Sequence, residues 1–266
     1  MLVVWLLSLM MTGGKPVDPQ KVEQALIDNP DAKIVAFVHA ETSTGAISDA
    51  KLLCEIANKH GCLNIVDAVT SLAGSELRVD DWGIDAIYSG SQKCLSAMPG
   101  LSPVSFSDRA IHKFTHRKTP VTSWFLDLNL VMGYWGKGAK RAYHNTAPVN
   151  TLYGLHESLV MLTEEGLENS WARHKKNHEH LRDGLNKLGI HYLVDESSRL
   201  PQLNSVFIPE KSDDAKVRSS LMNDFNIEIG SGLGDLAGTI WRIGLMGHTS
   251  RKENVELCLS ALQEAI

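Results

Sequence analysis

The chain has 266 residues, of which 43% are apolar, and a formal net charge of -5. This length and composition are typical of a soluble protein with a sizeable core, organised as one large and one smaller domain. The mild acidity and the lack of long basic runs exclude nucleic acids and anionic membranes as expected partners. The cysteines show no Cys-x-x-Cys spacing, which favours reduced thiols inside a cell over disulfides or zinc; they are Cys54, Cys62, Cys94 and Cys258.

The chain opens with an uncharged apolar run at residues 1–11. The run is too short to cross a bilayer as a helix, and it lacks the basic start and the small-residue cleavage site of a signal peptide. A buried strand is one interpretation of it. A predicted helix follows, because Asp18 is a suitable N-cap, Pro19 suits the first helical position and Pro30 ends the pattern.

Strands and helices then alternate. The apolar residues 34–38 predict a strand, and the polar residues 39–45 predict a loop after it. Residues 48–60 have the pattern of an amphipathic helix, and residues 62–67 and 86–88 predict two more buried strands. This order predicts an α/β fold with a mostly parallel sheet.

Two of these strands lead to residues that can act in catalysis, Asp67 and Lys93. Ligands of an open parallel sheet bind beyond the carboxyl ends of its strands, so we expect both side chains to face one crevice. Such a pair suits pyridoxal phosphate, because a lysine holds the aldehyde as a Schiff base and an acid keeps the pyridine nitrogen protonated. The alternatives are a structural ion pair for Asp67 and a solvated surface position for Lys93. Cys94, beside the lysine, is either accessible or a packing residue.

The segment after the lysine predicts a strand at 102–106, possibly antiparallel, and a basic, solvated helix at 108–118. Residues 150–188 have a long helical pattern that ends at Gly189 and bridges the two domains. His174 and His178 lie one turn apart in it, but no glutamate follows the first histidine and lysines surround the pair. We therefore expect no metal site.

The C-terminal part contains a glycine cluster at 230–234, which predicts a flexible loop because no helix follows it. Arg242 is flanked by apolar residues on a predicted half-buried strand, 239–246. A guanidinium there needs a counter-ion, and its planar fork suits the carboxylate of an amino-acid substrate. A structural salt bridge is the alternative. Residues 250–262 predict a closing amphipathic helix.

Six segments, taken in order, resemble the alanine-glyoxylate (serine-pyruvate) aminotransferases, a branch of the class-V aminotransferase family within the fold-type-I pyridoxal phosphate enzymes. The resemblance extends from about residue 13 to the C-terminus. Each motif alone is of modest value, and their order and spacing together are specific. They are TSTG at 42–45, VDAVTSLAG at 66–74, SGSQK at 89–93, YHNT at 143–146, GLENSW at 166–171 and WRIGLMG at 241–247.

The resemblance implies a three-layer α/β fold, with a large cofactor-binding domain at 1–155 and a small α+β domain at 156–266. It implies that Lys93 is the catalytic lysine, that Asp67 contacts the pyridine nitrogen, and that Arg242 binds the substrate carboxylate. It also assigns further residues to the cofactor: Thr42 and Gln92 within the subunit, and Tyr143 and Thr146 across a homodimer axis. For Ser43 and Thr44 a role in forming the turn alone is an equal alternative, and read without the family Tyr143 is an ordinary half-buried aromatic.

The implied activity is transamination from alanine or serine to glyoxylate or pyruvate. Two alternatives stay open: a related 3-hydroxykynurenine transaminase or lyase, and a non-catalytic chain that pairs with full-length subunits. The second alternative arises because the family's phosphate-cupping loop and ring-stacking aromatic are not found in this chain. The resemblance favours a peroxisomal location, with a mitochondrial one possible, although the sequence has neither a Ser-Lys-Leu-type tail nor an Arg-rich presequence.

Overall fold

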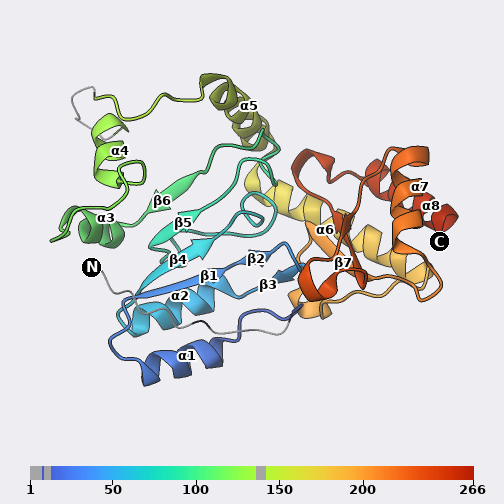
Figure 1. Cartoon of the computed structure of the whole chain (residues 1–266), viewed down its shortest axis with the longest axis horizontal. Helices are drawn as coiled ribbons and strands as arrows, with labels where there is room; N and C mark the ends of the chain where they lie inside the picture. The colour runs from blue at the N-terminus through green and yellow to red at the C-terminus, as the bar shows by residue number, and fades with distance from the viewer. Residues whose placement is uncertain (1–7, 9–12, 136–141) are drawn as a thin grey trace.

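The computed structural model describes residues 8, 13–135 and 142–266. It contains a four-stranded and a small two-stranded sheet in the first half of the chain and a three-stranded sheet in the second half, with helices packed on the two larger sheets (Figure 1). The strand predicted within residues 1–11 lies outside the described residues, apart from Ser8. None of the helices in the described part of the chain has the length and apolar character needed to span a bilayer.

The larger sheet has the mostly parallel character that the sequence predicts. Its strands, in sheet order, are β1 (Ile34–Val38), β4 (Leu63–Asp67), β5 (Ala86–Tyr88) and β6 (Val104–Phe106). The first three run parallel and β6 is antiparallel. Val38 is paired with Asp67, and Asp67 with Tyr88, so the three parallel strands end side by side at one edge.

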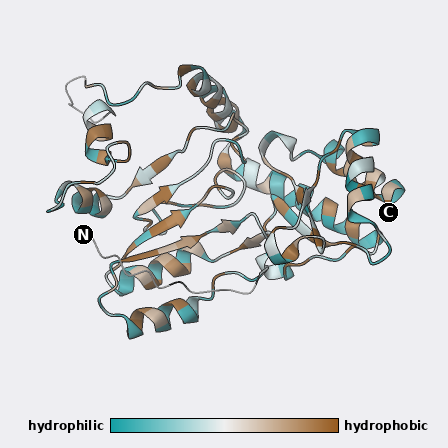
Figure 2. Cartoon of the chain, viewed as in Figure 1, coloured by the Kyte–Doolittle hydropathy of each residue, from teal (hydrophilic) through white to brown (hydrophobic). Residues whose placement is uncertain are grey.

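Two helices cover β1 and β4, namely α1 (Pro19–Asp28) and α2 (Ala50–Lys59). Each begins where an aspartate caps it: Asp18 accepts a hydrogen bond from the Gln20 amide, and Asp49 accepts one from the Leu52 amide. Their buried side chains form a core with the sheet. In Figure 2 the strands are brown and the outer faces of these helices are largely teal, as expected for amphipathic elements.

The loop predicted at 39–45 is more ordered than the sequence indicates. It contains β2 (Ala40–Glu41), which pairs antiparallel with β3 (Ala46–Ile47) to form a small hairpin. Gly45 has φ +78°, a conformation that a side chain would strain, and this residue turns the chain between the two strands. Polar composition alone does not distinguish such a short hairpin from a loop.

The long helix predicted at 150–188 is in fact two helices, α5 (Val149–Glu165) and α6 (Leu167–Lys187). The break lies at Gly166, whose φ of +85° leaves the helical region. Glycine adopts this conformation without a Cβ clash, so the chain can change direction there. Two shorter helices precede α5, namely α3 (Asp108–Thr115) and α4 (Leu128–Trp135). The predicted domain boundary after residue 155 falls within α5, and the division stays a prediction.

The second sheet is antiparallel, with the order β7 (Leu203–Phe207), β9 (Ile240–Gly244) and β8 (Gly230–Ser231). The glycine cluster predicted as a loop therefore contributes a short strand. The remaining elements are α7 (Asp214–Phe225), α8 (Lys252–Ala265) and the 3-10 turns η1 (Glu196–Ser198), η2 (Gly234–Leu236) and η3 (Gly247–Thr249). Figure 1 shows α6 running from the first sheet to the second.

A buried apolar cluster joins α6, α7 and α8 to this second sheet. Leu181 on α6 lies within it and is fully buried. Replacing Leu181 by alanine is expected to lower the free energy of unfolding by about 2–5 kcal/mol, because a cavity replaces its contacts. Urea denaturation measures the change. Lys175→Ala, on an exposed position of the same helix, is the control, and an equal loss in both variants would contradict the packing argument.

Candidate active site

Asp67 is the last residue of β4, at the edge where the three parallel strands end. Its Oδ1 accepts a hydrogen bond of 2.9 Å from the Val69 amide, and its Oδ2 accepts one of 2.7 Å from the Tyr88 hydroxyl. Burial and the Asp67 carboxylate together raise the pKa of Tyr88 to about 12, so the phenol stays a donor. A carboxylate has room for more than two donors, so Asp67 can accept a further N–H from a ligand.

Lys93 lies five residues beyond the end of β5, in residues 91–98, which we call the lysine loop. The loop is closed at its base, because the Ser91 hydroxyl donates to the Met98 carbonyl at 2.6 Å and the Ala97 amide donates to the Ser91 carbonyl at 2.9 Å. Lys93 is half-buried, and its amine forms no hydrogen bond or ion pair with the residues that the structure describes. The loop therefore presents an amine that is free for a ligand.

Arg242 lies on β9 and reaches across to the first half of the chain. Its Nε donates to the Ser231 carbonyl at 2.8 Å, and one terminal nitrogen donates to the Thr42 carbonyl at 3.1 Å. Gly230, its register partner on β8, leaves room beside the guanidinium because it has no side chain. Within the described ranges Arg242 makes no ion pair with an acidic side chain, so the structural salt bridge is not observed there.

The structure thus brings Arg242 and Thr42 together, although they are 200 residues apart in sequence. Thr42 is half-buried, and its hydroxyl makes no hydrogen bond with the described residues. Gln92 is exposed beside Lys93. Asp67 provides an accepting carboxylate, and the other side chains provide an amine, a guanidinium, a hydroxyl and an amide as donors, groups that suit an anionic amino-acid ligand and its cofactor.

Tyr143 and Thr146 lie apart from this group, in the connection between α4 and α5 at the top of Figure 1. Their hydroxyls contact each other, and the Tyr143 side chain is 74% exposed. No hydrogen bond or ion pair joins the two to Asp67, Lys93 or Arg242 in the described ranges. A half-buried aromatic, the interpretation without the family, is wrong for Tyr143.

Sequence reasoning missed Tyr88 as a site residue, although a signal for it existed. Parallel register pairs it with Asp67, and both are the last residues of their predicted strands. Cys94 is a packing residue, because it is buried and its thiol points to the Thr70 carbonyl at 3.4 Å. Burial raises the pKa of Cys94 to about 12, so the thiol is not a nucleophile at neutral pH.

The two histidines on α6 are held by protein groups. His174 contacts the backbone of Ser170 and Gly247, and His178 contacts the Asn204 side chain at 2.6 Å. No cluster of three or more metal-ligating side chains occurs among the residues that the structure describes.

Comparison with known proteins finds similar sequences and structures among the aminotransferases. The chain is 42% identical over 249 residues to an alanine-glyoxylate aminotransferase of Callithrix jacchus, covering 93% of this chain and 60% of the relative. It is 37% identical over 271 residues to an (S)-ureidoglycine-glyoxylate transaminase of Bacillus subtilis, covering 95% and 64%. The crystal structure of an alanine-glyoxylate aminotransferase from Nostoc sp. superposes with a TM-score of 0.90 at 45% identity, covering 95% of this chain and 66% of that one.

The chain spans 60% to 66% of the length of these relatives. The family model of class-V aminotransferases matches residues 6–256, which is nearly the whole chain. The predicted α/β fold is confirmed by the structural match. The chain therefore belongs to the class-V aminotransferase family.

Proposed function

We propose that this chain is a pyridoxal-phosphate-dependent aminotransferase that moves an amino group from alanine or serine to glyoxylate or pyruvate. The observation that carries the proposal is that Asp67 and Lys93 follow the carboxyl ends of neighbouring parallel strands, with Arg242 reaching the same half of the chain. The relatives named above support the class of reaction. The substrates and the complete activity are part of the proposal, because the relatives are longer chains.

The side chains at the sheet edge fit the cofactor by their chemistry. Asp67 has spare acceptor capacity for a pyridine N–H, and Tyr88 and the Val69 amide hold its carboxylate in place. Among the described residues, neither the amine of Lys93 nor the hydroxyl of Thr42 has a hydrogen-bond partner, so both are available to the cofactor. We propose that Thr42 and Gln92 hold the cofactor within the subunit.

Pyridoxal phosphate, when bound, withdraws electrons from the α-carbon of an attached amino acid. The side chains of the protein hold the cofactor, orient the substrate and move the proton. Lys93 would hold the cofactor through Nζ until the amino donor displaces it, and the freed Nζ would then carry a proton from the substrate α-carbon to the cofactor. Arg242 binds the substrate carboxylate with its planar fork, which fixes the α-carbon relative to Lys93.

Tyr88→Phe tests whether the Asp67 carboxylate contributes to cofactor binding. The variant loses one of the two donors that orient Asp67, so we expect the affinity for pyridoxal phosphate to fall about fivefold, equivalent to about 1 kcal/mol. Fluorescence titration of the cofactor measures the dissociation constant. Tyr153→Phe, at a 73% exposed position on α5, is the control. An unchanged dissociation constant in Tyr88→Phe would contradict the role of Asp67.

A substrate panel tests the reaction itself. The purified chain, supplied with pyridoxal phosphate, is assayed with alanine and serine as donors and with glyoxylate and pyruvate as acceptors. The proposal expects turnover with at least one such pair. Turnover only with (S)-ureidoglycine or 3-hydroxykynurenine would keep the reaction class and reject the substrates. Cofactor capture without any turnover would reject the activity of this chain.

We also propose a homodimer in which Tyr143 and Thr146 bind the phosphate of the partner subunit's cofactor. Their exposed hydroxyls, apart from Lys93 in their own subunit, support this assignment. Mixing two weakened variants tests it. A dimer of one Lys93→Ala chain and one Tyr143→Phe/Thr146→Val chain would contain one intact site if the contacts cross the axis. Activity would then exceed that of either variant alone, whereas contacts within one subunit would give no gain.

A peroxisomal location, which the resemblance favours over a mitochondrial one, belongs to the same proposal. Microscopy of the tagged chain against markers of both organelles is the test. The tag is placed at the N-terminus in one experiment and at the C-terminus in another, so that each end of the chain is free in one of them.

A further inference from the structure

The lysine loop contributes Cys94 and Leu95 to a small apolar cluster and also borders a cavity. A cavity of about 470 Å³ opens there, lined in part by Cys94, Leu95 and Ser96. Within the loop, the Ser96 amide donates to the Lys93 carbonyl at 3.0 Å, and Ser96 adopts a left-handed φ of 59°. A non-glycine residue in this conformation needs support from its surroundings.

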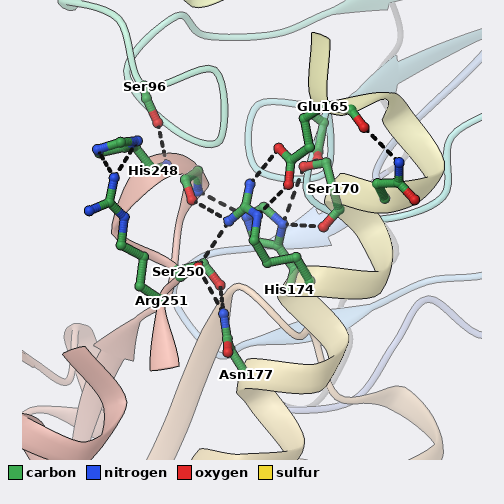
Figure 3. A network of polar contacts seen from close by, with 12 residues as sticks. Ser96, Glu165, Ser170, His174, Asn177, His248, Ser250 and Arg251 are labelled. Atoms are coloured by element: carbon green, nitrogen blue, oxygen red, sulfur yellow. Dashed lines mark hydrogen bonds and ion pairs between the residues drawn. The ribbon is translucent and has the colours of Figure 1, made fainter. Parts of the chain in front are cut away.

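That support comes from the turn η3, which carries Gly247 and His248. The His248 amide donates to the Ser96 hydroxyl at 2.8 Å (Figure 3). Gly247 has φ +56°, and a Cβ on it would overlap Ser96 and lie 2.6 Å from the Cys94 carbonyl oxygen. The turn therefore packs its backbone directly against the loop that follows Lys93.

His174 on α6 is fully buried and hydrogen-bonds to this turn. The Gly247 amide donates to its Nε2 at 2.9 Å, and its Nδ1 lies 2.7 Å from the Ser170 carbonyl. An amide only donates and a carbonyl only accepts, so both contacts require a neutral ring protonated on Nδ1. Burial holds the pKa of His174 below its usual value, which favours that state; the charged side chains nearby are Arg173 and Glu165.

Two further contacts connect the same cluster to the rest of the site. Arg173 donates to the carbonyls of Gly247 and Ser250 at 2.8 and 2.9 Å, and the Glu165 carboxylate holds its guanidinium (Figure 3). The Ser170 hydroxyl donates at 2.7 Å to the carbonyl of Ala73, in the segment that follows Asp67. This part of α6 therefore contacts the segment after Asp67 directly and is connected to the lysine loop through the Gly247 turn.

We propose that His174 is a positioning residue: its neutral imidazole fixes the Gly247 turn, and the turn fixes the lysine loop and so the place of Lys93. This inference rests on the role proposed above for Lys93. Both ring nitrogens of His174 are engaged by backbone groups, so it is neither a metal ligand nor a general base. It acts only through the Gly247 turn and the loop.

Hydrogen exchange in the cofactor-free chain tests the proposal without any need for activity. The expected result for His174→Leu is about tenfold faster amide exchange in residues 91–98, relative to the amides of β4, because local opening becomes easier. His174→Gln restores an acceptor at the position of Nε2, so its loop is expected to exchange close to the wild-type rate.

His178→Leu is the matched control, because His178 lies one turn further on the same helix, is also buried, and contacts Asn204 instead of the turn. It should lose global stability without selective exchange in the loop. Selective exchange in both leucine variants, or in neither, would overturn the proposal. If His174→Leu does not fold, amide exchange is measured in Ser96→Ala instead. This variant removes the hydrogen bond between the Gly247 turn and the lysine loop at an exposed residue, and faster exchange in the loop is expected. Unchanged exchange in that variant would also overturn it.

A second readout separates this proposal from the proposed function. Borohydride reduction of the cofactor-loaded wild-type chain marks the lysine that holds the cofactor, and peptide mapping identifies it. Absence of the mark on Lys93 rejects the proposed function, whereas the exchange experiment still reports on whether His174 and the Gly247 turn hold the lysine loop. With the mark present, His174→Leu is expected to lower kcat several-fold with little change in KM, and His174→Gln to recover it.

Discussion

Replacing Lys93 by alanine is expected to lower the rate of transamination by at least about 10³-fold, because the variant loses both the covalent attachment of the cofactor and the proton carrier at the α-carbon. The same variant should show no cofactor-modified peptide after borohydride reduction. Lys93→Arg should fail as well, since a guanidinium does not deprotonate in proteins and cannot attack an aldehyde. Assays with the best donor and acceptor pair measure the loss.

Lys51→Ala, at an exposed position on α2, is the control for the loss of a positive charge. It should retain wild-type activity and the borohydride mark. Addition of a small primary amine to Lys93→Ala should restore part of the rate, because a free amine can carry the proton without attachment to the chain. Full activity in Lys93→Ala would remove the basis for the proposed reaction.

The elements at the sheet edge could be predicted because local signals determine them. Asp18, followed by a proline, starts α1, and the apolar runs at 34–38 and 62–67 end where the strands β1 and β4 end. The long helical pattern at 150–188 predicts one helix, whereas the structure has two. Gly166 breaks it through a backbone angle that periodicity does not reveal, because the apolar pattern continues on either side.

Contacts between distant segments could not be predicted in the same way. The sequence gives no spacing rule that joins Arg242 to the Thr42 carbonyl, or His174 to the Gly247 amide. The spacing of His174 from His178 is the only feature of this histidine that the sequence shows. Its role depends on which backbone groups lie within 3 Å of the two ring nitrogens, and only the tertiary fold provides these partners.

Arg242→Ala is expected to lower kcat/KM for the amino donor by about 30- to 5000-fold, which corresponds to the 2–5 kcal/mol typical of removing one partner of a desolvated charge pair. Most of the loss should lie in KM, because the guanidinium binds the carboxylate in both the ground and transition states. Arg242→Lys should recover part of the loss, since a lysine keeps the charge but not the planar fork. Steady-state kinetics with alanine or serine measure both variants.

Arg242 also bonds the carbonyls of Ser231 and Thr42, so its loss could act through the fold instead. Cofactor capture at Lys93 separates the two roles. A substrate clamp leaves the affinity for pyridoxal phosphate near the wild-type value, whereas a structural arginine lowers cofactor affinity, stability and donor affinity together. Arg218→Ala is the control, because Arg218 pairs with Asp214 on α7, and its removal should change stability but not the KM of the donor. Equal donor KM values in Arg242→Ala and Arg218→Ala would exclude the clamp.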